Sequence, residues 1–86
     1  MGSLTISNPV ASLDGVEFTG ARDGLEQKFV VYRDGLEDIE HKLLETDEGM
    51  LEAFARHRLH IAEVAAKALD EGKGGPKMVI LQNLFL

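Results

Sequence analysis

Residues 25–43 read LEQKFVVYRDGLEDIEHKL, and the spacing of their apolar side chains changes within this stretch. Up to Arg33 the side chains alternate as they do in a strand. Behind the Asp34-Gly35 pair, apolar residues recur at three- and four-residue steps, at Leu36, Ile39 and Leu43. This second spacing is that of an amphipathic helix, for which Asp34 is the expected N-cap and Glu37 its capping-box partner. The stretch therefore predicts a strand that leads into a helix.

Two further strands are expected before residue 25. The first should end at Asn8-Pro9, because proline cannot donate a hydrogen bond to a sheet ladder. The second places Val16 and Phe18 on one face. Asp-Gly pairs at residues 14–15 and 23–24 are typical of the turns that join neighbouring antiparallel strands. The first third of the chain thus predicts a meander of three strands.

A second helix is expected from Thr46 to about Glu71, where Gly72 provides a left-handed C-cap. At 1.5 Å per residue such a helix would be about 37 Å long, which exceeds the expected width of a domain of this mass. Residues 77–84 form the last expected strand. The order β-β-β-α-α-β predicts an α+β fold of two layers, with a mainly antiparallel sheet covered by a helix pair.

The chain has 86 residues and a formal net charge of -6, without any cysteine. Its length suits a single domain over residues 1–86, with residues 1–3 as a loose N-terminus. Nucleic-acid binding is not expected, because such binding depends on many Lys and Arg contacts to phosphates. The absence of cysteine excludes disulfides, thiolate zinc sites and thiol nucleophiles. With no signal peptide and no apolar run of membrane-spanning length, a cytoplasmic protein without membrane contact is expected.

Arg58 projects from within the apolar stripe of the second predicted helix. Its charge must reach water or find a carboxylate, because an unpaired charge in a core is costly. Glu40 lies at the margin of the apolar face of the first helix. We therefore predict an ion pair between Glu40 and Arg58 across the helix pair. Alternatively, Arg58 binds a carboxylate or phosphate of a small ligand, together with His57, Tyr32 or Gln27.

Metal, cofactor and catalytic sites are not indicated by the residue spacing. His57 and His60 stand three residues apart, but His57 lies at the edge of the apolar stripe and His60 on the solvent side. We expect no metal ligands and no cofactor. No nucleophile motif surrounds the serine and threonine residues, so we expect no catalytic residue and favour a protein that is not an enzyme.

A pattern of mainly apolar residues spans most of the chain. It comprises Val16-x-Phe18, Gly24, Leu36, the segment Phe54-Ala-Arg-His-Arg-Leu-His-Ile61, Glu63-Val64-Ala65, Val79-x-Leu81 and Leu84-Phe85. This order resembles a family of small bacterial proteins catalogued as domain of unknown function 1488. The resemblance implies a compact bacterial domain of strands and helices, and it brings no established activity, cofactor or catalytic residue.

The function that we predict is a non-catalytic protein-interaction module, whose partner is another protein or a second copy of the chain. The long second helix and the apolar end Leu84-Phe85-Leu86 motivate this prediction, because a small domain has difficulty covering both. The alternative is a small anionic-ligand binder that uses Arg58. A closed Glu40–Arg58 pair would favour the first function, and an open pocket at Arg58 would favour the second.

Overall fold

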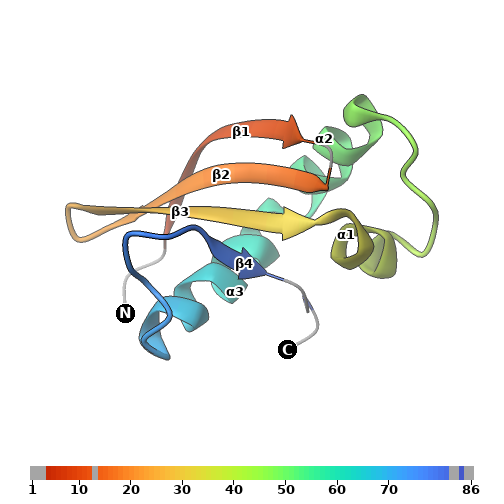
Figure 1. The fold of residues 1–86 in the computed structure, drawn as a ribbon. Coiled ribbons are helices and arrows are strands. Elements are labelled where there is room, and N and C mark those ends of the chain that lie inside the picture. Colours follow the sequence, from red (N-terminus) through yellow and green to blue (C-terminus); the bar gives the residue numbers. More distant parts are fainter. Residues whose placement is uncertain (1–3, 13, 82–83, 85–86) are drawn as a thin grey trace.

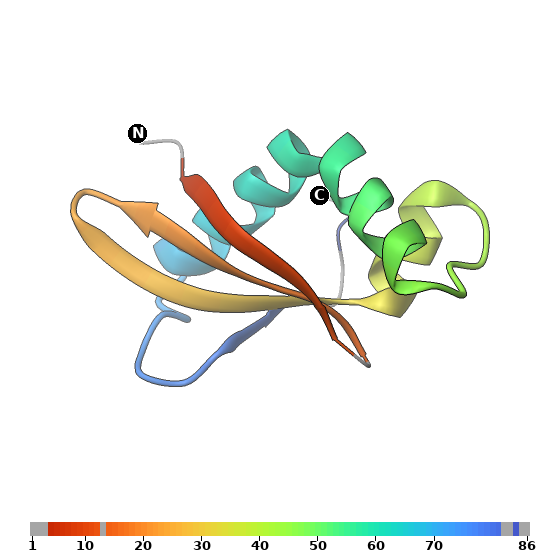
Figure 2. The ribbon, with the colours of Figure 1, turned by 90° about the horizontal axis from the view of Figure 1, so that it is seen from above.

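The computed structural model describes residues 4–12, 14–81 and 84. In chain order, the elements are β1 (Thr5–Ser12), β2 (Gly15–Arg22), β3 (Leu25–Tyr32), α1 (Arg33–Glu40), α2 (Asp47–Arg56), α3 (Arg58–Asp70) and β4 (Val79–Leu81). Within this part of the chain, α1, α2 and α3 all lie on one side of the sheet (Figures 1 and 2). The predicted α+β class is confirmed, with the sheet as one layer and the helices as the other.

The sheet has the strand order β1-β2-β3-β4. The first three strands form the predicted antiparallel meander, whereas β4 is parallel to β3, with Phe29 opposite Val79 and Val31 opposite Leu81. The last strand was expected over residues 77–84. It begins later, at Val79, and residues 82–83 and 85–86, like residues 1–3, lie outside the described ranges.

The edge strand β1 continues past the position at which the sequence predicts its end. It pairs Ser7 with Thr19 and resumes with Val10 opposite Glu17, with a shift of register between the two pairs. The predicted end at Asn8-Pro9 is therefore wrong. An edge strand accommodates a proline because one side of its backbone faces away from the sheet. The irregularity at residues 8–9 interrupts the pairing at the position where Pro9 has no N–H to donate.

The hairpin between β2 and β3 turns at Asp23-Gly24, as the sequence predicts. Asp23 has φ 55° and Gly24 has φ 81°. Two successive positive φ values are those of a type I′ turn, whose twist matches that of the flanking strands. The turn fixes an uninterrupted register between the two strands, from Arg22 opposite Leu25 to Gly15 opposite Tyr32.

Helix α1 begins directly at the end of β3, with Tyr32 rather than Asp34 as its N-cap. The Arg33 amide donates to the Asp14 carbonyl at 2.7 Å, so this N–H is satisfied by the β1–β2 turn. The Glu37 carboxylate accepts a hydrogen bond from the Leu44 amide at 2.8 Å. The predicted capping box is therefore wrong, because backbone and loop contacts replace it.

The long second helix predicted from the sequence is two helices. Its start is confirmed, since the Thr46 hydroxyl accepts a hydrogen bond from the Gly49 amide at 2.9 Å. At His57, however, the backbone leaves helical geometry (φ -106°, ψ 18°), and α2 and α3 meet there at an angle (Figure 2). The described residues extend 34 × 22 × 18 Å, so the break keeps both helices over the sheet.

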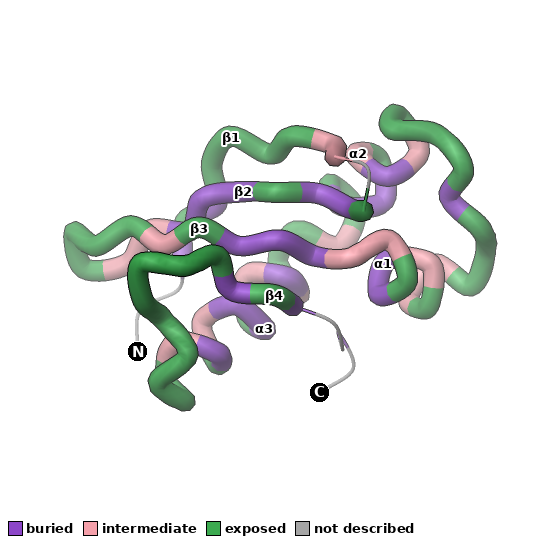
Figure 3. Tube along the Cα trace, in the orientation of Figure 1, coloured by how far each residue is buried: buried purple, intermediate pink, exposed green. Residues whose placement is uncertain are grey.

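The core lies between the helices and the sheet, where buried residues of both layers meet (Figure 3). Phe18 and Phe29 stack on neighbouring strands with ring centroids 5.2 Å apart, and Phe54 of α2 packs against Phe18 at the same distance. A Cβ atom at Gly20 would lie 2.5 Å from a Leu4 methyl carbon and 2.8 Å from the Phe29 ring. Glycine at this position thus allows the close packing of two large side chains.

Candidate functional site

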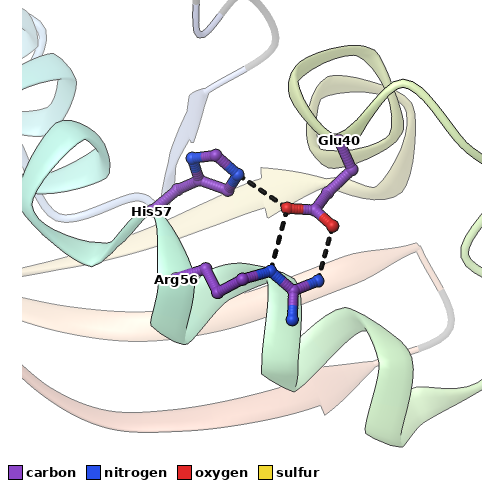
Figure 4. A network of polar contacts seen from close by, with 3 residues as sticks. All are labelled: Glu40, Arg56 and His57. Atoms are coloured by element: carbon purple, nitrogen blue, oxygen red, sulfur yellow. Dashed lines mark hydrogen bonds and ion pairs between the residues drawn. The ribbon is translucent and has the colours of Figure 1, made fainter.

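Glu40, at the end of α1, contacts Arg56, the last residue of α2, and His57, at the break between α2 and α3 (Figure 4). Its Oε1 accepts a hydrogen bond from Arg56 Nη2 at 2.5 Å, and its Oε2 accepts one from Arg56 Nε at 3.2 Å. His57 Nε2 lies 2.7 Å from the same Oε2. We call these residues the Glu40 cluster. One carboxylate therefore ties α1 to the junction of the other two helices.

The electrostatics of the Glu40 cluster keep its carboxylate charged. The hydrogen bond from Arg56 lowers the pKa of Glu40 from 4.5 to about 2, and the His57 contact acts in the same direction against the effect of burial. The Glu40 bond in turn raises the pKa of Arg56. Glu40 thus cannot act as a proton donor near neutral pH. The arrangement is suited to holding helices together.

The predicted partner of Glu40 was Arg58, and the structure corrects this pairing. Arg58 Nη2 donates a hydrogen bond to the Ile6 carbonyl of β1 at 2.5 Å. The reason is the break at His57: Arg56 ends α2 and reaches α1, whereas Arg58 begins α3 and reaches β1. Arg58 therefore satisfies a backbone carbonyl of the edge strand.

Gln27 is a structural bridge between β3 and the loop that follows α3. Its Nε2 donates to the carbonyls of Lys28 at 3.1 Å and Lys77 at 3.0 Å. Its Oε1 accepts a hydrogen bond from the Gly75 amide at 2.8 Å. Three backbone groups thus occupy the amide, and the two at Gly75 and Lys77 hold the loop that leads into β4.

The four residues predicted to hold a ligand do not converge. His57 and Arg58 are neighbours at the helix break, but His57 contacts Glu40 and Arg58 contacts β1. Gln27 and Tyr32 stand five positions apart on β3 and so point to opposite faces of the sheet. Tyr32 instead borders a hollow near the β1–β2 turn. The predicted set therefore does not form one site.

His60 has a partner that the sequence analysis missed. Its Nε2 contacts the Leu84 carbonyl, so α3 is linked to the chain beyond β4. No local motif signals this contact, because the two residues are 24 positions apart. Within residues 4–12, 14–81 and 84, no group of three or more His, Asp or Glu side chains is placed to hold a metal ion.

Three hollows on the described surface have different linings. One of about 400 Å³ is bordered by Asp14 and residues 32–34, and one of about 200 Å³ lies over the β1 irregularity. The third, of about 440 Å³, lies between the β2–β3 turn, the end of α3 and Gly74-Gly75. Arg58 lines none of the three, so these hollows do not support the Arg58 ligand site.

The sheet face opposite the helices, which we call the outer face, carries a row of side chains that crosses the sheet. The register places Val10 beside Glu17, Glu17 beside Val30, and Val30 beside Ile80. Val10 is 59% exposed and Ile80 is 49% exposed, whereas Val30 between them is buried. Lys28 lies two positions from Val30 and so points to the same face. The outer face thus combines exposed aliphatic side chains with charges of both signs.

The sequence profile of a family described as "Protein of unknown function (DUF1488)" matches residues 11–80. The chain belongs to the DUF1488 family. A solved DUF1488 structure, a protein of unknown function from Shewanella loihica PV-4, is similar with a TM-score of 0.83 and 18% identity. The similarity covers 96% of this chain and 97% of that chain. Comparison with curated proteins gives no match.

The family predicted from the sequence pattern is confirmed, and the solved DUF1488 structure supports the fold. At 18% identity the likeness carries no information on activity. Among the described residues of this DUF1488 chain, no helix is long and apolar enough to cross a membrane. Function must therefore be argued from the surfaces of the chain itself.

Proposed function

We propose that residues 1–86 act as one non-catalytic protein-interaction domain, and that its partner is a second copy bound through the outer face. One observation carries the proposal. The helices occupy one side of the sheet, while the other side exposes Val10 and Ile80 on either side of the buried Val30. Exposed aliphatic side chains in one row favour contact with another sheet of the same kind.

The charges of the outer face suit a symmetric pair of copies. Glu17 and Lys28 are both exposed and point to this face with opposite signs. In a two-fold arrangement Glu17 of each copy can meet Lys28 of the other copy, because such an interface is self-complementary. This pairing supports self-association despite the net charge of -6 on each chain.

The size of the outer face sets the expected strength of the dimer. Strands about 4.8 Å apart and roughly 20 Å long give a face of the order of 400 Å² per copy. A standard stable interface covers about 800 Å² per partner. We therefore expect a weak dimer that depends on protein concentration. Its place of action, on this proposal, is the bacterial cytoplasm.

The alternative function, a small anionic-ligand binder at Arg58, has less support. One nitrogen of the Arg58 guanidinium, Nη2, already donates to the Ile6 carbonyl. None of the three hollows is lined by Arg58, so they offer no concave site around it.

Sedimentation equilibrium up to about 500 µM tests the proposal at concentrations where a weak dimer is populated. The variant with Val10→Lys and Ile80→Lys places two cations in the row and should be monomeric. Leu59→Lys is the matched control, because Leu59 is 82% exposed on α3, on the other side of the sheet. A wild-type chain that stays monomeric contradicts the proposal, as does equal loss of the dimer in Leu59→Lys. Thermal melts establish that each variant is folded.

A further inference from the structure

The hollow at the β2–β3 turn has an apolar floor and a preformed shape. Leu25, 76% exposed, and Leu69 of α3 line it together with the backbone of Gly74 and Gly75. The hairpin tip and the end of α3 lie at the same end of the molecule (Figures 1 and 2). We call this hollow of about 440 Å³ the hairpin groove.

Three polar contacts hold the walls of the hairpin groove. Arg22 forms an ion pair with Asp70 at 2.9 Å, which ties the hairpin to the end of α3. Gln27 fixes the other wall through the Gly75 amide and the Lys77 carbonyl. These contacts restrain the groove before any partner arrives, which lowers the ordering cost of binding.

Gly74 keeps the floor of the groove uncrowded. A Cβ atom at position 74 would lie 2.9 Å from the Leu69 side chain, so any larger residue there would crowd the floor. At Gly75 a Cβ atom would meet nothing within 4 Å, and the amide of this residue already donates to Gln27. The apolar floor and the charges of the rim are therefore the features that a partner can recognise.

The rim of the groove is acidic. Arg22 is neutralised by Asp70, whereas Asp23 and Glu26 have no ion pair within residues 4–12, 14–81 and 84. Both carboxylates line the groove and are exposed. A partner that places positive charge beside an apolar side chain complements this combination, and an acidic partner is repelled.

We propose that the hairpin groove binds a basic segment of a partner protein, with one aliphatic side chain on Leu25 and Leu69 and flanking Lys or Arg side chains near Asp23 and Glu26. The apolar floor of the groove is separate from the outer face, since Leu25 stands at an odd position of β3 like the core residue Phe29, whereas Val30 and Lys28 stand at even positions. Glu26 also stands at an even position, so the rim of the groove borders the outer face at this residue. Val10 and Ile80 do not line the groove, so substitutions there test the outer face alone.

Titration with two capped five-residue peptides tests the groove, one with a lysine–leucine–lysine centre and one with a glutamate–leucine–glutamate centre. The backbone amide signals of Gly24, Gly74 and Gly75 in ¹⁵N-labelled protein are the readout. We expect the basic peptide to shift these signals and the acidic peptide to leave them unchanged. Absence of shifts with the basic peptide, or equal shifts with both, would overturn the proposal.

Variants separate the apolar and the charged contributions. Leu25→Ser, and separately Asp23→Asn combined with Glu26→Gln, should each weaken binding of the basic peptide about tenfold. Binding as strong as in the wild type in both variants contradicts the proposed site. The Val10→Lys, Ile80→Lys variant should bind the peptide as the wild type does, so failure of the dimer and failure of the groove are distinguishable.

Discussion

The Glu40 carboxylate and the Arg56 guanidinium meet through two hydrogen bonds, 2.5 and 3.2 Å long, across a separation of 16 residues in the chain. Because Arg56 is the last residue of α2, the contact fixes α1 against the point where the helical layer changes direction. His57 adds a second link from the break itself. One carboxylate therefore joins α1 to the α2–α3 junction, and its contribution to stability can be measured.

Acid should remove the contribution of Glu40 to stability. Its folded pKa of about 2 lies below the ordinary value of 4.5, so the contribution is complete above pH 4.5 and is lost as the pH falls towards 2. Glu40→Gln should lower the free energy of unfolding at pH 7 and flatten its decline in acid. Urea titrations at several pH values measure both effects. Glu45→Gln is the control, because Glu45 is exposed. If the free energy of unfolding depends on pH in the same way in the wild type, Glu40→Gln and Glu45→Gln, Glu40 does not have this stabilising role.

Removal of the Gln27 amide should loosen the loop before β4. In Gln27→Ala, the Gly75 amide loses its acceptor, and we expect its hydrogen exchange to become about tenfold faster. Gln27→Glu keeps an oxygen for Gly75 and loses the donor to Lys77, so protection of Gly75 should survive. Native-state hydrogen exchange followed by NMR distinguishes these cases. Unchanged exchange at Gly75 in Gln27→Ala would show that the bond is not formed in solution.

The type I′ turn makes Asp23 sensitive to branching at Cβ. Its φ of 55° is tolerated by Asp and Asn but strained for a β-branched residue. Asp23→Val should therefore cost roughly 1–2 kcal/mol of unfolding free energy, whereas Asp23→Asn should change it by less than about 0.5 kcal/mol. Chemical denaturation gives both values, and equal stabilities of the two variants would rule out the strained turn.

Phe18 should be among the most costly core residues to truncate. It is 2% exposed and contacts the rings of both Phe29 and Phe54. Phe18→Ala is expected to lower the unfolding free energy by about 3–5 kcal/mol. Leu59→Ala, at a position 82% exposed, should stay within about 0.5 kcal/mol of the wild type. Comparable losses in the two variants, measured in urea, would contradict this assignment of the core.

The parts of the fold that depend on neighbouring residues could be predicted from the sequence. The Asp23-Gly24 turn and the Thr46 cap are local, because turn and cap geometry depend on a few adjacent residues. The break at His57 is different. Neither glycine nor proline occurs between residues 50 and 71, and the break coincides with a contact to Glu40, which is distant in sequence. A pattern of apolar residues cannot show such a contact.

The candidate site was predictable only in part. Glu40 and Arg58 stand out in sequence because charges border apolar faces, and both make specific contacts in the structure. The partners predicted for Glu40 and Arg58 were wrong because the prediction assumed one continuous helix. The break at His57 changes the direction of every side chain after it. Gln27 was predicted to bind a ligand, but its three hydrogen bonds are to backbone groups. Contacts of a side chain with distant backbone groups cannot be predicted from the spacing of residues in the sequence.

The parallel strand β4 has a consequence for the order of folding. It pairs residues that are 50 positions apart, such as Phe29 with Val79, whereas the β2–β3 hairpin pairs residues joined by a two-residue turn. Closing the longer loop costs more chain entropy, so we expect β4 to join the sheet after the hairpin and the intervening helices have formed. Until β4 joins, β3 is an open edge, and we expect that a strand from another molecule can take the place of β4 at this stage.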